Sequence, residues 1–267
     1  MHHDAWRHLT AFTEARIAQG RVGASLPTEA VLSFQRSHAL ARDAVLKPWA
    51  FRELLTQLDT DGIRSLTLET GVVERSHYLQ RPDLGRRLSA QSLDSLVDRD
   101  SVPVDLALLM TNGLSSSAIE AHGLSLTRAI VAEAKNRGLS ISDVVIVPNA
   151  RVALSDQVGA LLRARTVLIM VGERPGLSAD DSVGLYLTYG PSLGRTDADR
   201  NCISNIRPPA GLGYEEAAFK AVYLAMAALN IGYSGVQLKD DSPQWLQLDD
   251  RVDCPALADH VCSDREI

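Results

Sequence analysis

The sequence has few aromatic residues and no long apolar segment. Aromatic side chains make up 5% of the 267 residues. No apolar run approaches the roughly 20 residues that a membrane-spanning helix needs, and the first residues lack the apolar core of a secretion signal. We therefore expect a cytoplasmic protein that does not enter a membrane.

Cysteine is also scarce. The three cysteines, Cys202, Cys254 and Cys262, follow no common zinc-binding spacing. A disulfide framework normally uses an even number of cysteines. We expect reduced thiols and no metal site.

The charge balance lacks the basic excess of a nucleic-acid-binding protein. The formal net charge is −6, and the arginines and lysines are scattered among acidic residues. Hydrophobic residues at 45% and charged residues at 22% are ordinary values for a folded globular chain. The length allows one large domain, or one domain with a helical appendage.

Strand-like and helix-like segments alternate through the second half of the chain. Residues 104–110, 144–147 and 166–171 are short apolar runs typical of buried strands. Helical patterns at 124–137 and 155–162 separate them. This alternation predicts an α/β fold with a doubly wound, Rossmann-like parallel sheet, preceded by an N-terminal helical segment.

The remaining elements complete the predicted organisation. We expect helices at 6–16, 25–47 and 215–230, strands at 63–69 and 183–189, a hairpin partner for the first of these strands at 72–79, and a helix that continues from residue 81 to residue 97. The predicted division is an N-terminal helical segment at 1–60, an α/β domain at 61–239 and a polar tail at 240–267.

Polar loops follow the three predicted parallel strands. They span residues 111–115, 148–152 and 172–176. The carboxyl ends of parallel strands open on one edge of a sheet, and α/β proteins bind ligands there. Their positions make Asn112, Arg151 and Arg174 candidate ligand contacts.

Several charged residues allow two interpretations. Glu173 is either a ligand contact or the salt-bridge partner of an arginine such as Arg174. His38 and Arg42 lie one helical turn apart, and they either contact a partner or stabilise their own helix. The arginines at 81, 86 and 87 either bind an anion or only solvate the start of a helix.

The sequence contains no recognisable catalytic constellation. It has no Gly-x-Ser-x-Gly, His-Glu-x-x-His, Walker or Gly-x-Gly-x-x-Gly motif in the required context. Cys202 has no histidine near it in the sequence. We therefore predict no catalytic residue in this chain.

A set of ordered motifs nevertheless resembles one family. The chain reads Gly-Glu-Arg-Pro-Gly-Leu at 172–177 and Asp-Arg-Asn-Cys-Ile-Ser-Asn-Ile at 199–206. Further matching runs lie at 15–21, 40–45, 78–88, 112–115, 151–152 and 156–157. Together they resemble the small subunit of ethanolamine ammonia-lyase, an adenosylcobalamin-dependent enzyme.

The resemblance implies a function and a partner. Such enzymes convert ethanolamine to acetaldehyde and ammonia by a radical mechanism. By this resemblance, Val152, Glu173 and Cys202 match cobalamin-contacting positions. The large subunit, a (β/α)8 barrel, carries the substrate-binding residues, and the cofactor lies between the two chains in a hetero-oligomer with multiple copies.

The resemblance also frames the cofactor state and the location. None of the seven histidines lies in the Asp-x-His-x-x-Gly pattern that displaces the lower axial base, so we expect base-on cobalamin. Family members packaged in a bacterial microcompartment often carry a longer N-terminal extension. The matching region here begins near Met1, so we expect a cytoplasmic chain and leave open whether it works free in the cytosol or inside a bacterial microcompartment.

Two alternative functions stay open at this stage. The chain could be a scaffold with little cofactor role, or an independent α/β enzyme that uses Cys202 as a nucleophile.

Overall fold

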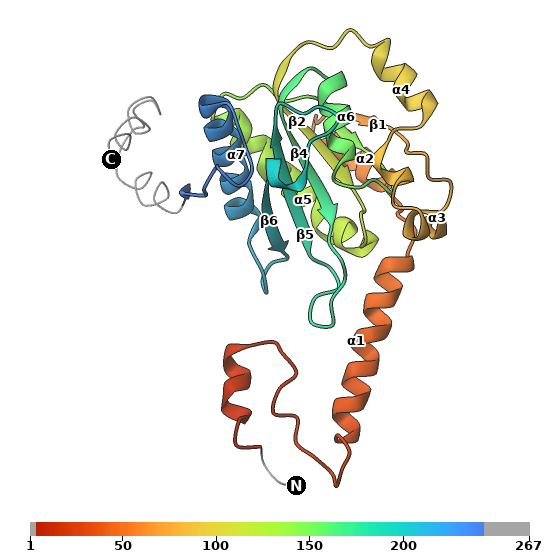
Figure 1. Ribbon diagram of the computed structural model, residues 1–267, viewed down its shortest axis with the longest axis vertical. Coiled ribbons are helices and arrows are strands. Elements are labelled where there is room, and N and C mark those ends of the chain that lie inside the picture. Colours follow the sequence, from red (N-terminus) through yellow and green to blue (C-terminus); the bar gives the residue numbers. More distant parts are fainter. Residues whose placement is uncertain (1–3, 243–267) are drawn as a thin grey trace.

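The computed structural model describes residues 4–242, and the polar tail beyond them lies outside the described residues (Figure 1). The elements in chain order are η1 Arg7–Phe12, α1 Thr28–Leu46, α2 Arg52–Thr60, β1 Ser65–Thr67, α3 Arg75–Gln80, η2 Leu84–Arg86, α4 Ala90–Val97, β2 Val104–Thr111, α5 Ser116–Asn136, β3 Val144–Ile146, α6 Leu154–Leu161, β4 Ala164–Gly172, β5 Val183–Tyr189, η3 Asp197–Asp199, β6 Arg200–Ile206 and α7 Tyr214–Ile231. No helix within residues 4–242 is long and apolar enough to cross a membrane.

The α/β fold is confirmed, with a mixed sheet. Its six strands follow the order β1-β3-β2-β4-β5-β6. The first four are parallel, as the apolar runs predict. β5 lies antiparallel to β4, and β6 antiparallel to β5. The β4–β5 connection carries no helix, so it lacks the crossover that a parallel pair needs.

Helices cover the sheet on both faces. On one face, α2, α5 and α7 pack on alternate residues of β2, β4 and β5, such as Leu108, Leu168 and Leu185. On the other face, α4 and α6 pack on Leu109 and Ile169. Continuous buried runs in the central strands follow from this two-sided cover.

Local signals set several helix boundaries. Ser115 caps α5, since its side chain accepts a hydrogen bond from the Ala118 N–H at 3.1 Å, so the helix begins earlier than the predicted residue 124. α6 begins at Leu154 after Ala153 and not after a Ser155 cap. α7 ends at Ile231, close to the predicted boundary, and Gly232 follows it with a φ of 84°, which suits glycine.

The segment after β1 contradicts its prediction. Residues 72–79 do not pair with β1 as a hairpin, because 75–80 form the short helix α3 and β1 pairs with β3 instead. Only Tyr78 of α3 is buried, which suits one turn of helix with one anchoring ring. The predicted helix from 81 to 97 also divides into η2 and α4.

The N-terminal region extends from the α/β body. Figure 1 shows α1 in orange leading away from the sheet to a segment that carries η1. Its exposed apolar side chains include Trp6, Phe12 and Leu32, which are 64%, 83% and 59% exposed. α2 belongs to the body, since Leu54 and Leu58 are buried in the core beneath α5. The division at residue 60 stays a prediction.

Candidate functional site

The loops after β2, β3 and β4 meet at one edge of the sheet, as their positions predict. The Leu114 N–H donates to the Gly172 carbonyl at 2.9 Å. The Asn149 N–H donates to Oδ1 of Asn112 at 2.7 Å. Asn112 is only 1% exposed, so this side chain joins two loops and does not face a ligand.

Two glycines permit this close approach. A Cβ on Gly172 would lie 2.1 Å from the Ser115 carbonyl oxygen. A Cβ on Gly113, which has a φ of 47°, would lie 2.3 Å from Cγ1 of Val171. The loops therefore pack against one another and form a continuous surface.

That surface is an open pocket of about 420 Å³. The lining residues are Tyr78, Gly113, Leu114, Ala150, Arg151, Val152, Val171, Gly172, Glu173, Arg174, Tyr186 and Ser204. The sequence-predicted Val152 and Glu173 thus lie in one pocket, together with Arg151 and Arg174. We call it the sheet-edge pocket.

Glu173 is oriented by β6. Its carboxylate accepts hydrogen bonds from the Ser204 hydroxyl and, at 3.2 Å, from the Asn205 N–H. Its own N–H donates to the Ser182 carbonyl at 3.0 Å. No ion pair links Glu173 to Arg174 among the described side chains. The carboxylate is thus held by two neutral donors and has no cationic partner, so its oxygens can accept a further hydrogen bond from a ligand.

Cys202 lies beside the sheet-edge pocket on β6. It faces Tyr186 across the β5–β6 pair and is exposed. Partial burial raises the pKa of the Cys202 thiol, a hydrogen bond with Tyr186 opposes this, and the charge of Glu173 raises it further. Burial and the neighbouring thiol raise the pKa of Tyr186 as well. Both groups stay protonated near neutral pH, so Cys202 lacks the thiolate that a nucleophile requires.

The open face of the last two strands explains this exposure. Leu185 and Ile206 point toward the core beside α7. Tyr186, Cys202 and Ser204 lie on the opposite face, where they are half-buried or exposed.

Residues missed by the sequence reasoning complete the pocket. Tyr78 and Ser204 lie within the motif runs that carry the family resemblance, but their pocket positions depend on packing between distant segments. Arg75 lies next to the pocket and stacks on the Tyr78 ring, with its guanidinium carbon 4.9 Å from the ring centroid. No local sequence signal marks Arg75.

Other predicted polar residues lie elsewhere. Arg81 pairs with Asp83 at 2.7 Å on the surface, and Arg86 and Arg87 are exposed. His38 stacks near Phe34 of its own helix, and Arg42 contacts Asp43 at 3.4 Å. The anion-binding interpretation of the three arginines and the partner-binding interpretation of His38 and Arg42 stay predictions.

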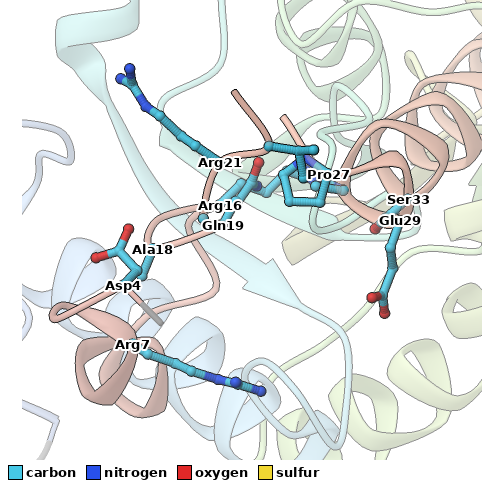
Figure 2. A pocket seen from close by; sticks show the side chains of 12 residues that line it. Asp4, Arg7, Arg16, Ala18, Gln19, Arg21, Pro27, Glu29 and Ser33 are labelled. Atoms are coloured by element: carbon cyan, nitrogen blue, oxygen red, sulfur yellow. The ribbon is translucent and has the colours of Figure 1, made fainter. Parts of the chain in front are cut away.

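A second pocket lies in the N-terminal region between η1 and α1 (Figure 2). Its lining includes Asp4, Arg7, Arg16, Arg21 and Glu29. Figure 2 shows Arg7 and Arg21 extending in different directions, so these charges do not converge on one ligand. The described residues also contain no group of three or more His, Cys, Asp or Glu placed to hold a metal ion.

Comparison with known proteins adds to this geometry. The model of the ethanolamine ammonia-lyase light chain (EutC) family matches residues 3–239. The small subunit from Xanthomonas campestris pv. campestris is 48% identical over 246 residues, which cover 91% of this chain and 90% of that protein. Those from Pseudomonas fluorescens and Rhodococcus erythropolis are 47% and 46% identical, over 92% and 90% of this chain and 90% and 91% of theirs.

The match spans the α/β body and the N-terminal region alike, and it includes every residue of the sheet-edge pocket. The chain belongs to the ethanolamine ammonia-lyase light-chain family.

Proposed function

We propose that this chain is the small subunit of an ethanolamine ammonia-lyase and that its sheet-edge pocket holds one side of adenosylcobalamin. The observation that carries the proposal is the convergence of Val152 and Glu173 in one open pocket, with Cys202 on the adjoining exposed face. The pocket lies where open α/β sheets bind ligands.

The lining suits the chemistry of a corrinoid. The corrin rim carries many carboxamides, which need both hydrogen-bond donors and acceptors around an apolar floor. Val152, Val171 and the Tyr186 ring supply apolar surface. The Glu173 carboxylate accepts from amide N–H groups, and Arg174 donates to amide carbonyls.

In this proposal, the residues of this chain bind and orient the cofactor. Glu173, held by Ser204 and the Asn205 N–H, presents a fixed acceptor. The neutral Cys202 thiol and the backbone near Val152 add contacts that carry no net charge. Bound adenosylcobalamin supplies the radical chemistry, and we expect it base-on. The chain's contribution is to hold the cofactor and exclude water from it.

The proposed partner is the large subunit. An open pocket encloses only part of a ligand as large as cobalamin, so a second surface must complete it. The N-terminal region offers exposed apolar side chains for this contact, including Trp6, Phe12 and Leu32. We propose a hetero-oligomer with multiple copies that is inactive without its large subunit.

The location proposed is the cytoplasm. Co-purification with microcompartment shell proteins from its own host would support packaging, and purification without them would favour a chain that works free in the cytosol.

Replacement of Glu173 by alanine separates the cofactor role from a scaffold role. In the complex with the large subunit, we expect weaker adenosylcobalamin binding with unchanged assembly. Unchanged affinity would support the scaffold alternative. Cys202→Ala tests the independent enzyme, since loss of a nucleophile would abolish turnover, whereas loss of one cofactor contact would only weaken binding.

A further inference from the structure

Two arginines next to the sheet-edge pocket stack on one aromatic ring. The guanidinium carbon of Arg151 lies 4.2 Å from the Tyr78 ring centroid, and that of Arg75 lies 4.9 Å from it. The Tyr78 hydroxyl donates to the Ala150 carbonyl at 3.0 Å, which fixes the ring. Two positive charges therefore share one neutral side chain.

Neither arginine forms an ion pair with any carboxylate in residues 4–242. Burial lowers the pKa of Arg75, and the charge of Arg151 lowers it further despite the Tyr78 ring. The lack of a carboxylate partner for two neighbouring arginines is unusual in a chain of net charge −6, where acidic residues outnumber basic ones. The arrangement concentrates positive charge without neutralising it.

The two arginines differ in how they are held. Arg75 donates to the carbonyls of Val45 at 2.9 Å and Gly113 at 2.7 Å, and to Oδ1 of Asn149 at 2.9 Å. Arg151 makes one long side-chain bond, to the Tyr78 carbonyl at 3.4 Å. Arg75 is thus held in place by three hydrogen bonds, whereas Arg151 lines the pocket and has guanidinium N–H groups that can bind a ligand.

The pair also leaves buried donors without partners. Nη2 of Arg75 and Nε of Arg151 are buried and form no hydrogen bond. An unsatisfied buried donor destabilises the folded state, and does so more when it is charged. Stability alone does not account for such an arrangement, whereas a bound anion would offset the unpaired charge.

Gly85 fits this interpretation. A Cβ there would lie 3.0 Å from the Tyr78 ring and 3.2 Å from Cγ of Arg151, so the loop that carries Gly85 packs directly against the stack. The backbone N–H of Arg151 also donates to the Gly85 carbonyl at 2.7 Å. The segment that carries Gly85 therefore holds the backbone of Arg151 in place.

We propose that Arg151, supported by the charge of Arg75, forms a subsite for one phosphate ester group of the ligand in the sheet-edge pocket. A guanidinium fork fits a phosphate or a carboxylate. We assign phosphate because adenosylcobalamin carries one phosphodiester and no carboxylate, so this assignment rests on the proposed function. Arg151 is the contact residue and Arg75 the positioning residue.

The test compares two ligands that differ by one phosphate. The affinities of adenosylcobinamide phosphate and adenosylcobinamide are measured by spectroscopic titration, using the complex with the large subunit. The unaltered complex is expected to prefer the phosphate-bearing ligand about tenfold or more. Arg151→Gln is expected to remove this preference and leave adenosylcobinamide binding unchanged.

Arg163→Gln is the matched control, because it removes one exposed arginine that does not line the sheet-edge pocket. It should retain the preference. Arg75→Lys keeps the charge and is expected to retain most of the preference, whereas Arg75→Gln reduces it.

Three results for Arg151→Gln would overturn the subsite. The first is an equal loss of affinity for both ligands, and the second is no loss of affinity for either. The third is weaker subunit assembly without any ligand, which would show that Arg151 binds a carboxylate of the large subunit. If the unaltered complex does not bind adenosylcobalamin itself, the proposed function fails. Calorimetry with dimethyl phosphate and the full chain then decides the subsite: binding that Arg151→Gln removes supports it, and no binding refutes it.

Discussion

Arg200 on β6 and Asp156 on α6 form a bidentate ion pair, with both N–O distances at 2.7 Å and both side chains 3% exposed. Arg200 also donates to the Thr188 hydroxyl at 2.8 Å. The pair connects the outer strands to the helix beside the sheet-edge pocket. It therefore fixes the strand that carries Cys202 and Ser204.

Asp156→Ala is expected to lower the free energy of unfolding by about 3–5 kcal/mol, because it leaves a buried guanidinium unpaired. Denaturant unfolding measures this loss. Asp83→Ala removes the exposed partner of Arg81 and should cost far less. Similar losses in the two variants would contradict a structural role for the buried pair.

Gly113→Ala is expected to destabilise the fold and distort the sheet-edge pocket. The new Cβ would collide with Val171 and with the Gly172 carbonyl. Gly138 is a matched control, since its φ is also positive, at 73°, but nothing lies within 4 Å of an added Cβ. The loss in Gly113→Ala should exceed that in Gly138→Ala by about 1–3 kcal/mol, measured by denaturant unfolding. Equal losses would show that only backbone strain matters.

Cys202 is expected to react slowly with iodoacetamide. Its raised pKa leaves less thiolate at pH 8 than an ordinary cysteine has, and the reaction should accelerate only at higher pH. Glu173→Gln removes a negative charge that raises this pKa, so alkylation at pH 8 should become faster. Mass spectrometry follows the reaction in a chain with Cys254 and Cys262 replaced by serine. A rate that Glu173→Gln leaves unchanged would refute this coupling.

Leu32→Glu is expected to weaken assembly with the large subunit by about 1–2 kcal/mol, because it places a charge on an exposed apolar position of α1. Val97→Glu changes an equally apolar position at the end of α4, which is 62% exposed. Its assembly should match that of the unaltered chain in sedimentation measurements. Normal assembly of Leu32→Glu would remove this part of α1 from the proposed interface.

The sequence predicts the centre of the sheet well. β3 and the central parts of β2 and β4, residues 106–110 and 167–171, are uninterrupted apolar runs typical of buried parallel strands, so their loops and the meeting of Gly113, Val152 and Glu173 could be foreseen. The direction of β5 could not be read from its composition, because buried strands look alike in either direction. The short β4–β5 connection was the available signal.

The arginine stack is harder to foresee. Arg75, Tyr78 and Arg151 meet only through tertiary packing, and Arg75 lies in a segment that reads equally well as a strand. The motif runs contain residues that stabilise the fold as well as residues that line the pocket. Asp156 and Arg200 stabilise the fold, whereas Glu173 lines the pocket, and the sequence alone does not separate these roles.

The most direct test measures adenosylcobalamin affinity and acetaldehyde release from ethanolamine for this chain alone, for the large subunit alone and for their mixture. The account predicts tight cofactor binding and turnover only in the mixture. Turnover by this chain alone, or full turnover by the large subunit without it, would contradict the proposal that this chain holds the cofactor for its partner.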